Sequence, residues 1–129
     1  MGVAALVTAS LLIAVPASAD LIRDREYWLD QYGFTEVWNS TQGAGVKVAV
    51  IDTGIDGSVA DLEGAVVGGA DMSGLGSADG QTPVGPDSEH GTMVASVLAG
   101  RGTGPNSGVI GVAPAAELLS VSVAFGDDS

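Results

Sequence analysis

The sequence has no cysteine, one histidine and only four basic side chains among its 129 residues. Without cysteine, a disulfide scaffold and a thiolate metal site are both excluded. Sixteen Asp and Glu residues oppose the four Lys and Arg, so the formal net charge is −12 at pH 7. A chain this acidic is not expected to bind nucleic acid or an anionic membrane surface. The 46% of hydrophobic residues and the 20 glycines indicate a compact globular domain with many tight turns.

Charged side chains are also absent from the first nineteen residues. An apolar stretch over residues 3–15 is followed by a proline and by a small-residue triplet that ends at Ala19, which is typical of a signal peptide cut after that alanine. A permanent membrane anchor is the alternative, but the stretch is shorter than the roughly 20 residues that a span needs. We therefore expect a secreted or cell-surface protein, with residues 1–19 as signal peptide and residues 20–129 as the domain.

Three short apolar segments are predicted to be strands. Residues 46–52 and 118–124 are apolar on both faces, as in buried parallel strands, and residues 65–72 form a third candidate. Residues 73–89 are rich in Gly, Ser, Pro and Asp and are expected to form a surface loop. Strands that alternate with helical or looped crossovers predict an α/β fold with a mainly parallel sheet.

The predicted helices are few. The longest begins at His90, where Val94, Val97 and Leu98 form an apolar stripe that is expected to face the core, and glycine ends the helix. A short helical turn is expected earlier in the chain, with Thr35 as its N-cap and with residues 37–38 directed toward the core.

Two side chains suited to acid–base chemistry stand at the ends of these elements. Asp52 closes the first strand, and His90, the only histidine, opens the long helix. In open α/β sheets, functional residues gather at the carboxyl ends of strands and the amino ends of the following helices. A carboxylate that accepts the Nδ1 proton of an imidazole fixes the tautomer and leaves Nε2 free to take a proton from a nucleophile. The helix dipole disfavours a cationic imidazole and the carboxylate favours it, so we expect a pKa near neutrality.

Each residue taken alone has a simpler explanation. An aspartate before Thr-Gly commonly makes only an Asx-turn, and a histidine at a helix start is commonly a cap or a surface residue. The two following residues fit either case, because Gly91 allows the backbone to pass close to a ligand and Thr92 can bond within the first helical turn. The conjunction of Asp52 with His90 favours catalysis.

Three segments together resemble the subtilisin-like serine proteases, or subtilases: AVIDTGID at 49–56, HGTMVAS at 90–96 and GVAPAAELLSVSV at 111–123. They occur in that family's order with compatible spacing, and the stretch before Asp52 looks closest to the mycosin-like subtilases of actinobacteria. The resemblance implies part of a subtilisin-like three-layer fold. It also implies that Asp52 is the orienting acid and His90 the general base of an Asp-His-Ser triad.

The third member of such a triad is not found in these 129 residues. The family's nucleophile lies in a Gly-Thr-Ser-x-Ala-x-Pro segment, and this sequence contains none. Neither Ser88 nor Ser129 is expected on a rigid turn aimed at the imidazole.

We expect the truncated N-terminal part of a secreted serine endopeptidase that acts on polypeptides without a cofactor. Its partner would be the missing C-terminal part of the same domain, and the 129 residues alone would be inactive. The alternative is a non-catalytic remnant or binding module that keeps the scaffold.

A structural calcium ion and an acidic rim are two further features that the resemblance suggests. Asp61 falls where some subtilases place a calcium ligand, and Asn106 lies in the loop after the helix, but calcium requires six to eight oxygens and a plain surface loop is the simpler alternative. A transition metal at His90 would lack a second soft ligand.

Asp87 and Glu89 fall beside the family's pocket for the substrate residue two before the cut bond. Their charge would favour basic side chains there, unless they only form a solvated loop.

Overall fold

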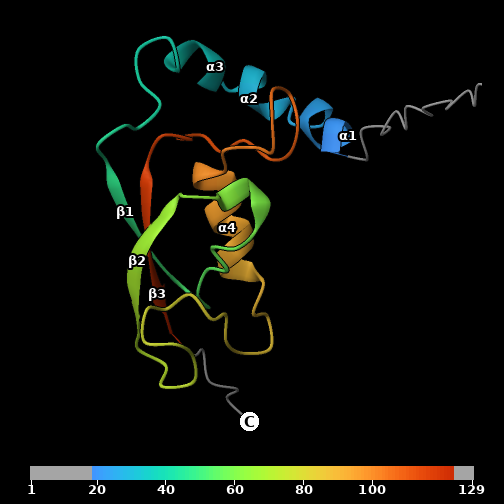
Figure 1. Cartoon of the computed structure of the whole chain (residues 1–129). Helices are drawn as coiled ribbons and strands as arrows, with labels where there is room; N and C mark the ends of the chain where they lie inside the picture. Colours follow the sequence, from blue (N-terminus) through green and yellow to red (C-terminus); the bar gives the residue numbers. More distant parts are fainter. Residues whose placement is uncertain (1–18, 124–129) are drawn as a thin grey trace, which may run out of the picture.

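The computed structural model describes residues 19–123. Its strands form one parallel sheet: β1 (Lys47–Asp52), β2 (Val66–Asp71) and β3 (Glu117–Ser122). The strand order is β1-β3-β2, so the last strand of the described chain lies in the centre (Figure 1). The predicted α/β fold with a parallel sheet is confirmed. Ala124, the predicted end of the third strand, and residues 1–18 of the predicted signal peptide lie outside the described residues.

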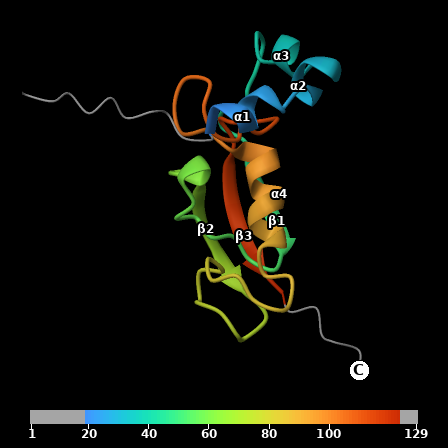
Figure 2. The same cartoon turned by 90° about the vertical axis from the view of Figure 1, so that its right-hand side faces the viewer.

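The helices occupy two regions of the molecule: α1 (Ala19–Asp24), α2 (Trp28–Gln31) and α3 (Phe34–Val37) at one end, and η1 (Ala60–Leu62) and α4 (His90–Ala99) beside the sheet. Both views show α4 along one face of the sheet and the three short helices gathered beyond its end (Figures 1 and 2). Across residues 19–123, none of these helices has the length and apolar character required to cross a bilayer.

The core lies between α4 and the sheet. Its buried members are Val50, Ile55, Leu62, Ala65, Ala95, Ala99, Ala116 and Leu118. The buried residues of α4 are all small: Gly91, Ala95 and Ala99. Val94 and Val97 are 39% and 51% exposed, whereas Leu98 is partly buried against the core. The predicted core-facing stripe is therefore wrong for the two valines, because small side chains let α4 approach the sheet closely and the valines point away from it.

The opposite face of the sheet is open within the described residues. Ile51 of β1 is 66% exposed, and Val67 of β2, on the far side of β3, is 45% exposed. Parallel sheets are normally covered on both faces, so these side chains form an apolar surface for which residues 19–123 provide no cover.

The prediction for the short turn near Thr35 is wrong in its details. Thr35 lies inside α3 rather than at its cap, and its hydroxyl donates to the Asp30 carboxylate at 2.8 Å. Val37 is exposed rather than directed toward the core. The Trp38 indole Nε1 is partly buried and donates to the Val112 carbonyl at 2.9 Å.

The N-terminal helices are tied to the loop that follows α4. The Arg23 guanidinium donates to the carbonyl oxygens of Gly108 at 3.1 Å and Ser107 at 3.2 Å. Glu26 is buried, pairs with Arg23 at 3.0 Å and accepts the Ile110 N–H at 3.2 Å. Burial raises the pKa of the Glu26 carboxyl, although the Ile110 N–H and the Arg23 charge oppose the rise. One ion pair thus joins segments more than eighty residues apart.

Candidate active site

Asp52 and His90 lie in contact at the junction of β1 and α4. The imidazole Nδ1 is 2.9 Å from both carboxylate oxygens of Asp52. The Asp52 side chain is 14% exposed and the His90 side chain 57% exposed. The acid is thus enclosed, while the imidazole reaches the surface with Nε2 on the side of the ring away from the carboxylate. The structure brings the two predicted residues together, and their catalytic role stays a prediction.

Asp52 and His90 shift each other's pKa. Partial burial alone would raise the pKa of Asp52, but hydrogen bonds from His90 and from the Thr53 N–H, together with the imidazole charge, outweigh burial and lower it. The hydrogen bond to Asp52 raises the pKa of His90 above its ordinary value, and the charges of Asp52 and Asp87 act in the same direction. Partial desolvation of the ring opposes the rise. The imidazole is therefore a stronger base than free histidine.

The start of α4 packs directly on the turn that follows Asp52. A side chain at Gly91 would overlap the Gly54 carbonyl oxygen and would lie 3.1 Å from the Thr53 hydroxyl. The chain's own turn thus fills the space that the missing side chain of Gly91 leaves, and close approach of a ligand to this backbone stays a prediction. The Thr92 hydroxyl accepts the Asp56 N–H at 2.9 Å, so Thr92 bonds across to the turn and not within its own helical turn.

Thr53 is a site residue that the sequence analysis missed. The sequence indicates only that Thr53 follows Asp52 in a possible Asx-turn, yet its hydroxyl bonds the backbone on both sides of His90. Its partners, Ser88 and Gly91, lie 35 and 38 residues further along the chain. No local sequence pattern reports such a contact, because it exists only once α4 has docked on β1.

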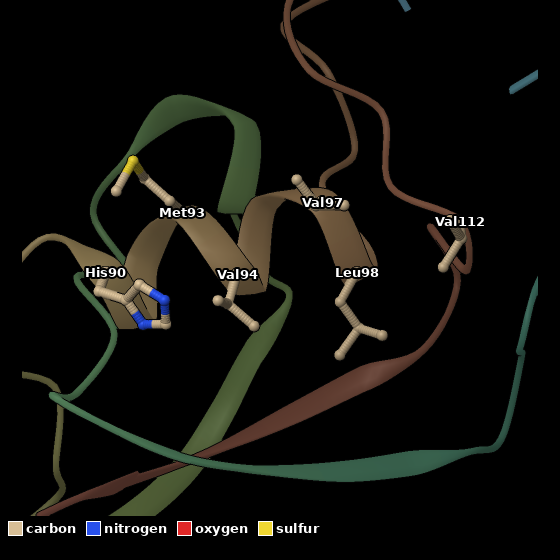
Figure 3. Close-up of a pocket in the computed structure, with 6 residues that line it drawn as sticks. All are labelled: His90, Met93, Val94, Val97, Leu98 and Val112. Carbon is tan, nitrogen blue, oxygen red and sulfur yellow. The ribbon is translucent and has the colours of Figure 1, made fainter. Parts of the chain in front are cut away.

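His90 borders two hollows. One, of about 330 Å³, is lined by Asp52, Thr53, Asp87, Glu89, His90 and Met93. The other, of about 500 Å³, is lined by His90, Met93, Val94, Val97, Leu98 and Val112, and Figure 3 shows the imidazole at one end of this apolar row.

The structure places Asp87 and Glu89 beside the imidazole, in the lining of the first hollow. That they favour basic substrate side chains stays a prediction, which cleavage of matched peptides with lysine or leucine at that position would test.

The predicted calcium ligands do not form a recognisable site. Asp61 Oδ1 accepts the Val109 N–H at 3.0 Å, and the Asp61 carbonyl oxygen accepts the Arg101 N–H. Asn106 lies at φ 66° in the same loop. In the part of the chain that the structure describes, no three His, Asp or Glu side chains are grouped so as to hold a metal ion. Asp61 acts here as a tether for the loop, and calcium binding stays an untested expectation.

The fold and the site define a class of protein, an α/β domain whose sheet edge carries a coupled acid and imidazole. Residues 43–129 match the profile described as the subtilase family, and the chain belongs to that family.

Two curated relatives illustrate the match. An intracellular serine protease of Paenibacillus polymyxa is 43% identical over 88 residues, which are 67% of this chain and 26% of that protein. Mycosin-1 of Mycobacterium tuberculosis is 42% identical over 98 residues, which are 73% of this chain and 20% of that protein. The chain therefore spans about a quarter or less of the length of these relatives.

A solved structure gives the same result for the fold. The serine protease MycP1, described as an essential component of the type VII (ESX-1) secretion system, superposes with a TM-score of 0.63 at 36% identity. The superposition covers 88% of this chain and 28% of MycP1. The predicted resemblance to subtilases, with mycosins among them, is confirmed.

Proposed function

We propose that this chain carries the acid and the base of a subtilisin-like serine endopeptidase. The observation that carries the proposal is the contact of His90 Nδ1 with both oxygens of Asp52 at 2.9 Å. Membership of the subtilase family supports the reaction class, which is hydrolysis of polypeptides.

In this proposal the pair performs proton transfer in a fixed order. His90 Nε2 takes the proton of a serine hydroxyl as its oxygen attacks the scissile carbonyl, and Asp52 stabilises the imidazolium that forms. The imidazolium then gives the proton to the leaving amine, and water hydrolyses the acyl-enzyme in the same manner. The chemistry needs no cofactor.

The serine belongs to the remainder of a longer domain in this proposal. Its segment would pack on the apolar hollow beside His90, where Met93, Val94 and Val97 are exposed. The 129 residues alone, which contain no Gly-Thr-Ser segment, would then perform no acyl transfer.

Export is part of the proposal. The apolar run before Ala19 supports a signal peptide and hence a secreted or cell-surface enzyme. Mass spectrometry of the protein from its native host tests this point: an N-terminus at Asp20 is expected, and an intact N-terminus on the exported protein would contradict it.

The decisive experiment compares the 129-residue chain with the product of the gene read past codon 129. A fluorophosphonate probe, which labels activated serines, is expected to label the longer product and not the shorter one. In the longer product Asp52→Asn should lower kcat about 10⁴-fold, by analogy with other triads.

Asp56→Asn is the matched control for this variant. Asp56 lies in the same turn, but its carboxylate bonds Ser58 and not His90. Stable labelling of the 129-residue chain, or equal activity of the two aspartate variants, would overturn the proposal.

A further inference from the structure

One buried hydroxyl connects the two halves of the Asp52–His90 pair. We propose that Thr53 is a positioning residue that holds the backbone around His90 at the distance from Asp52 that their contact requires. The catalytic meaning of this role rests on the proposed function, but the geometry itself is testable without any turnover.

The Thr53 hydroxyl bonds the chain on both sides of His90. Thr53 is 7% exposed. Its Oγ1 donates to the Ser88 carbonyl oxygen at 2.9 Å and accepts the Gly91 N–H at 3.0 Å. Ser88 precedes His90 by two residues and Gly91 follows it directly, so a single side chain fixes the backbone from which the imidazole projects.

The backbone of the same residue holds the acid. The Thr53 N–H donates to Asp52 Oδ1 at 2.7 Å, and this oxygen also contacts His90 Nδ1 at 2.9 Å. The Thr53 carbonyl in turn accepts the Val84 N–H at 2.8 Å, which anchors the turn to the loop before α4. Every hydrogen-bonding group of Thr53 is thus engaged, and two of the three act on the pair.

The hydroxyl also completes the amino end of α4. The first N–H groups of a helix have no partner within the helix, and a side-chain cap normally satisfies one of them. Glu89, the N-cap of α4, makes no such bond with its side chain. Thr53 supplies the bond from another segment, so the position of the helix start depends on the end of β1.

Only a hydroxyl can fill this role in the space available. The Ser88 and Gly91 contacts require one atom that both donates and accepts, a property that threonine and serine share and valine lacks. Gly91 allows the approach, because a side chain there would meet the Thr53 hydroxyl at 3.1 Å. Without the hydroxyl, a carbonyl and an N–H lose their buried partners, and the start of α4 is free to move away from Asp52.

The test reads the single imidazole by NMR in the 129-residue chain. Because His90 is the only histidine, its ring signals need no assignment. Thr53→Val removes the hydroxyl at nearly constant shape, and Thr53→Ser keeps it. Thr92→Val is the matched control. The Thr92 hydroxyl joins the same turn to the same helix by accepting the Asp56 N–H, but it does not bond the Ser88 carbonyl or the Gly91 N–H on either side of His90.

We expect Thr53→Val to shift the pKa of His90 down toward its ordinary value and to speed solvent exchange of the Nδ1 proton. Thr53→Ser and Thr92→Val should retain the wild-type pKa and exchange rate. Wild-type behaviour of Thr53→Val, or an equal shift in Thr92→Val, would overturn the proposal.

Two further outcomes are also decisive. If Thr53→Val does not fold, Thr53→Ser decides: a wild-type imidazole supports the role of the hydroxyl, and a shifted one shows that the lost methyl group mattered instead. If the longer gene product lacks peptidase activity while the variants behave as expected, the proposed function fails and the positioning role stands.

Discussion

At the scale of single residues, the site is a pair of groups that titrate together. Asp52 and His90 each stabilise the charged form of the other, which is why the pKa of the acid is lowered and that of the imidazole raised. The helix dipole at the start of α4 opposes a charged imidazole, but the direct contact with the carboxylate is the larger influence. A base with a raised pKa accepts a proton more readily.

The coupling predicts how stability depends on pH. A group whose pKa is raised by folding stabilises the fold fully below its unfolded value, here 6.5 for His90, and loses that contribution as pH rises through the folded value. Asp52, with a lowered pKa, stabilises above 3.8 and loses its contribution as pH falls through the folded value. The pair should therefore stabilise most between these two values.

Urea unfolding of the wild type and of His90→Gln checks this expectation. Between a pH inside this window and a pH well above it, the free energy of unfolding of the wild type should fall by more than that of the variant. Equal losses of unfolding free energy in both proteins would show that the contact between Asp52 and His90 contributes nothing to the pH dependence of stability.

The two site residues could be predicted from sequence because each stands at the end of a recognisable element. Asp52 follows a run of apolar strand residues, and His90 is unique and opens the long helix. Thr53 could not be predicted in the same way, because its role depends on partners 35 and 38 residues away. The tie between Arg23 and Gly108 escaped prediction for the same reason.

At the scale of elements, α4 shows why a correct helix can be assigned the wrong face. Both sides of this helix are apolar, with Ala95 and Ala99 on one and Val94 and Val97 on the other. Large side chains dominate a hydrophobic pattern, so the pattern predicts the valines in the core. Close packing selects the alanines instead, because they bring the helix backbone near the sheet and let Gly91 reach the turn after β1.

Ala95→Leu tests this packing. Ala95 is fully buried against the sheet, so added methylenes should force α4 outward and lower the free energy of unfolding by about 1–3 kcal/mol. Val97→Leu also enlarges a side chain of the helix, but at a 51% exposed position, and should change stability by less than about 0.5 kcal/mol. Denaturant unfolding followed by circular dichroism measures both variants, and a larger loss for Val97→Leu would reverse the assignment of the two faces.

The N-terminal helices should stabilise the loop after α4. Arg23→Ala removes charge-assisted bonds to two carbonyls of that loop, bonds of a kind worth about 1.5–3 kcal/mol each. Hydrogen exchange at the Gly102 and Thr103 amides, which close the loop internally, should become at least about tenfold faster.

Arg25→Ala is the control for this experiment, because Arg25 is exposed and only two positions away. Unchanged exchange in Arg23→Ala, or an equal effect of Arg25→Ala, would show that the contact does not hold the loop.

At the scale of the whole molecule, residues 19–123 leave two apolar surfaces open. One is the face of the sheet that carries Ile51 and Val67, and the other is the face of α4 that carries Val94 and Val97. An uncovered face is expected from the sequence, because three parallel strands with few helices cannot be covered on both sides. The strand order could not be predicted: β3 inserts between β1 and β2, and no local pattern specifies which strands become edges. The parallel direction was predictable, because crossovers separate the strands.

These surfaces predict self-association of the isolated 129-residue chain. Size-exclusion chromatography should show an apparent mass that rises with concentration. Val97→Lys should reduce association, whereas Asn39→Lys, which adds the same charge at an exposed polar position, should not. A concentration-independent monomer would contradict this expectation.

The central claim is that the Asp52 carboxylate at the end of β1 hydrogen-bonds the His90 imidazole at the start of α4 and fixes its orientation. A ¹⁵N NMR titration of the 129-residue chain, in the wild type and in Asp52→Asn, tests it most directly because only one histidine contributes. We predict a neutral ring with its proton on Nδ1 and a pKa above the ordinary value, which falls in Asp52→Asn and stays unchanged in the Asp56→Asn control. A proton on Nε2 in the neutral ring, or a pKa that does not respond to Asp52→Asn, would contradict the account.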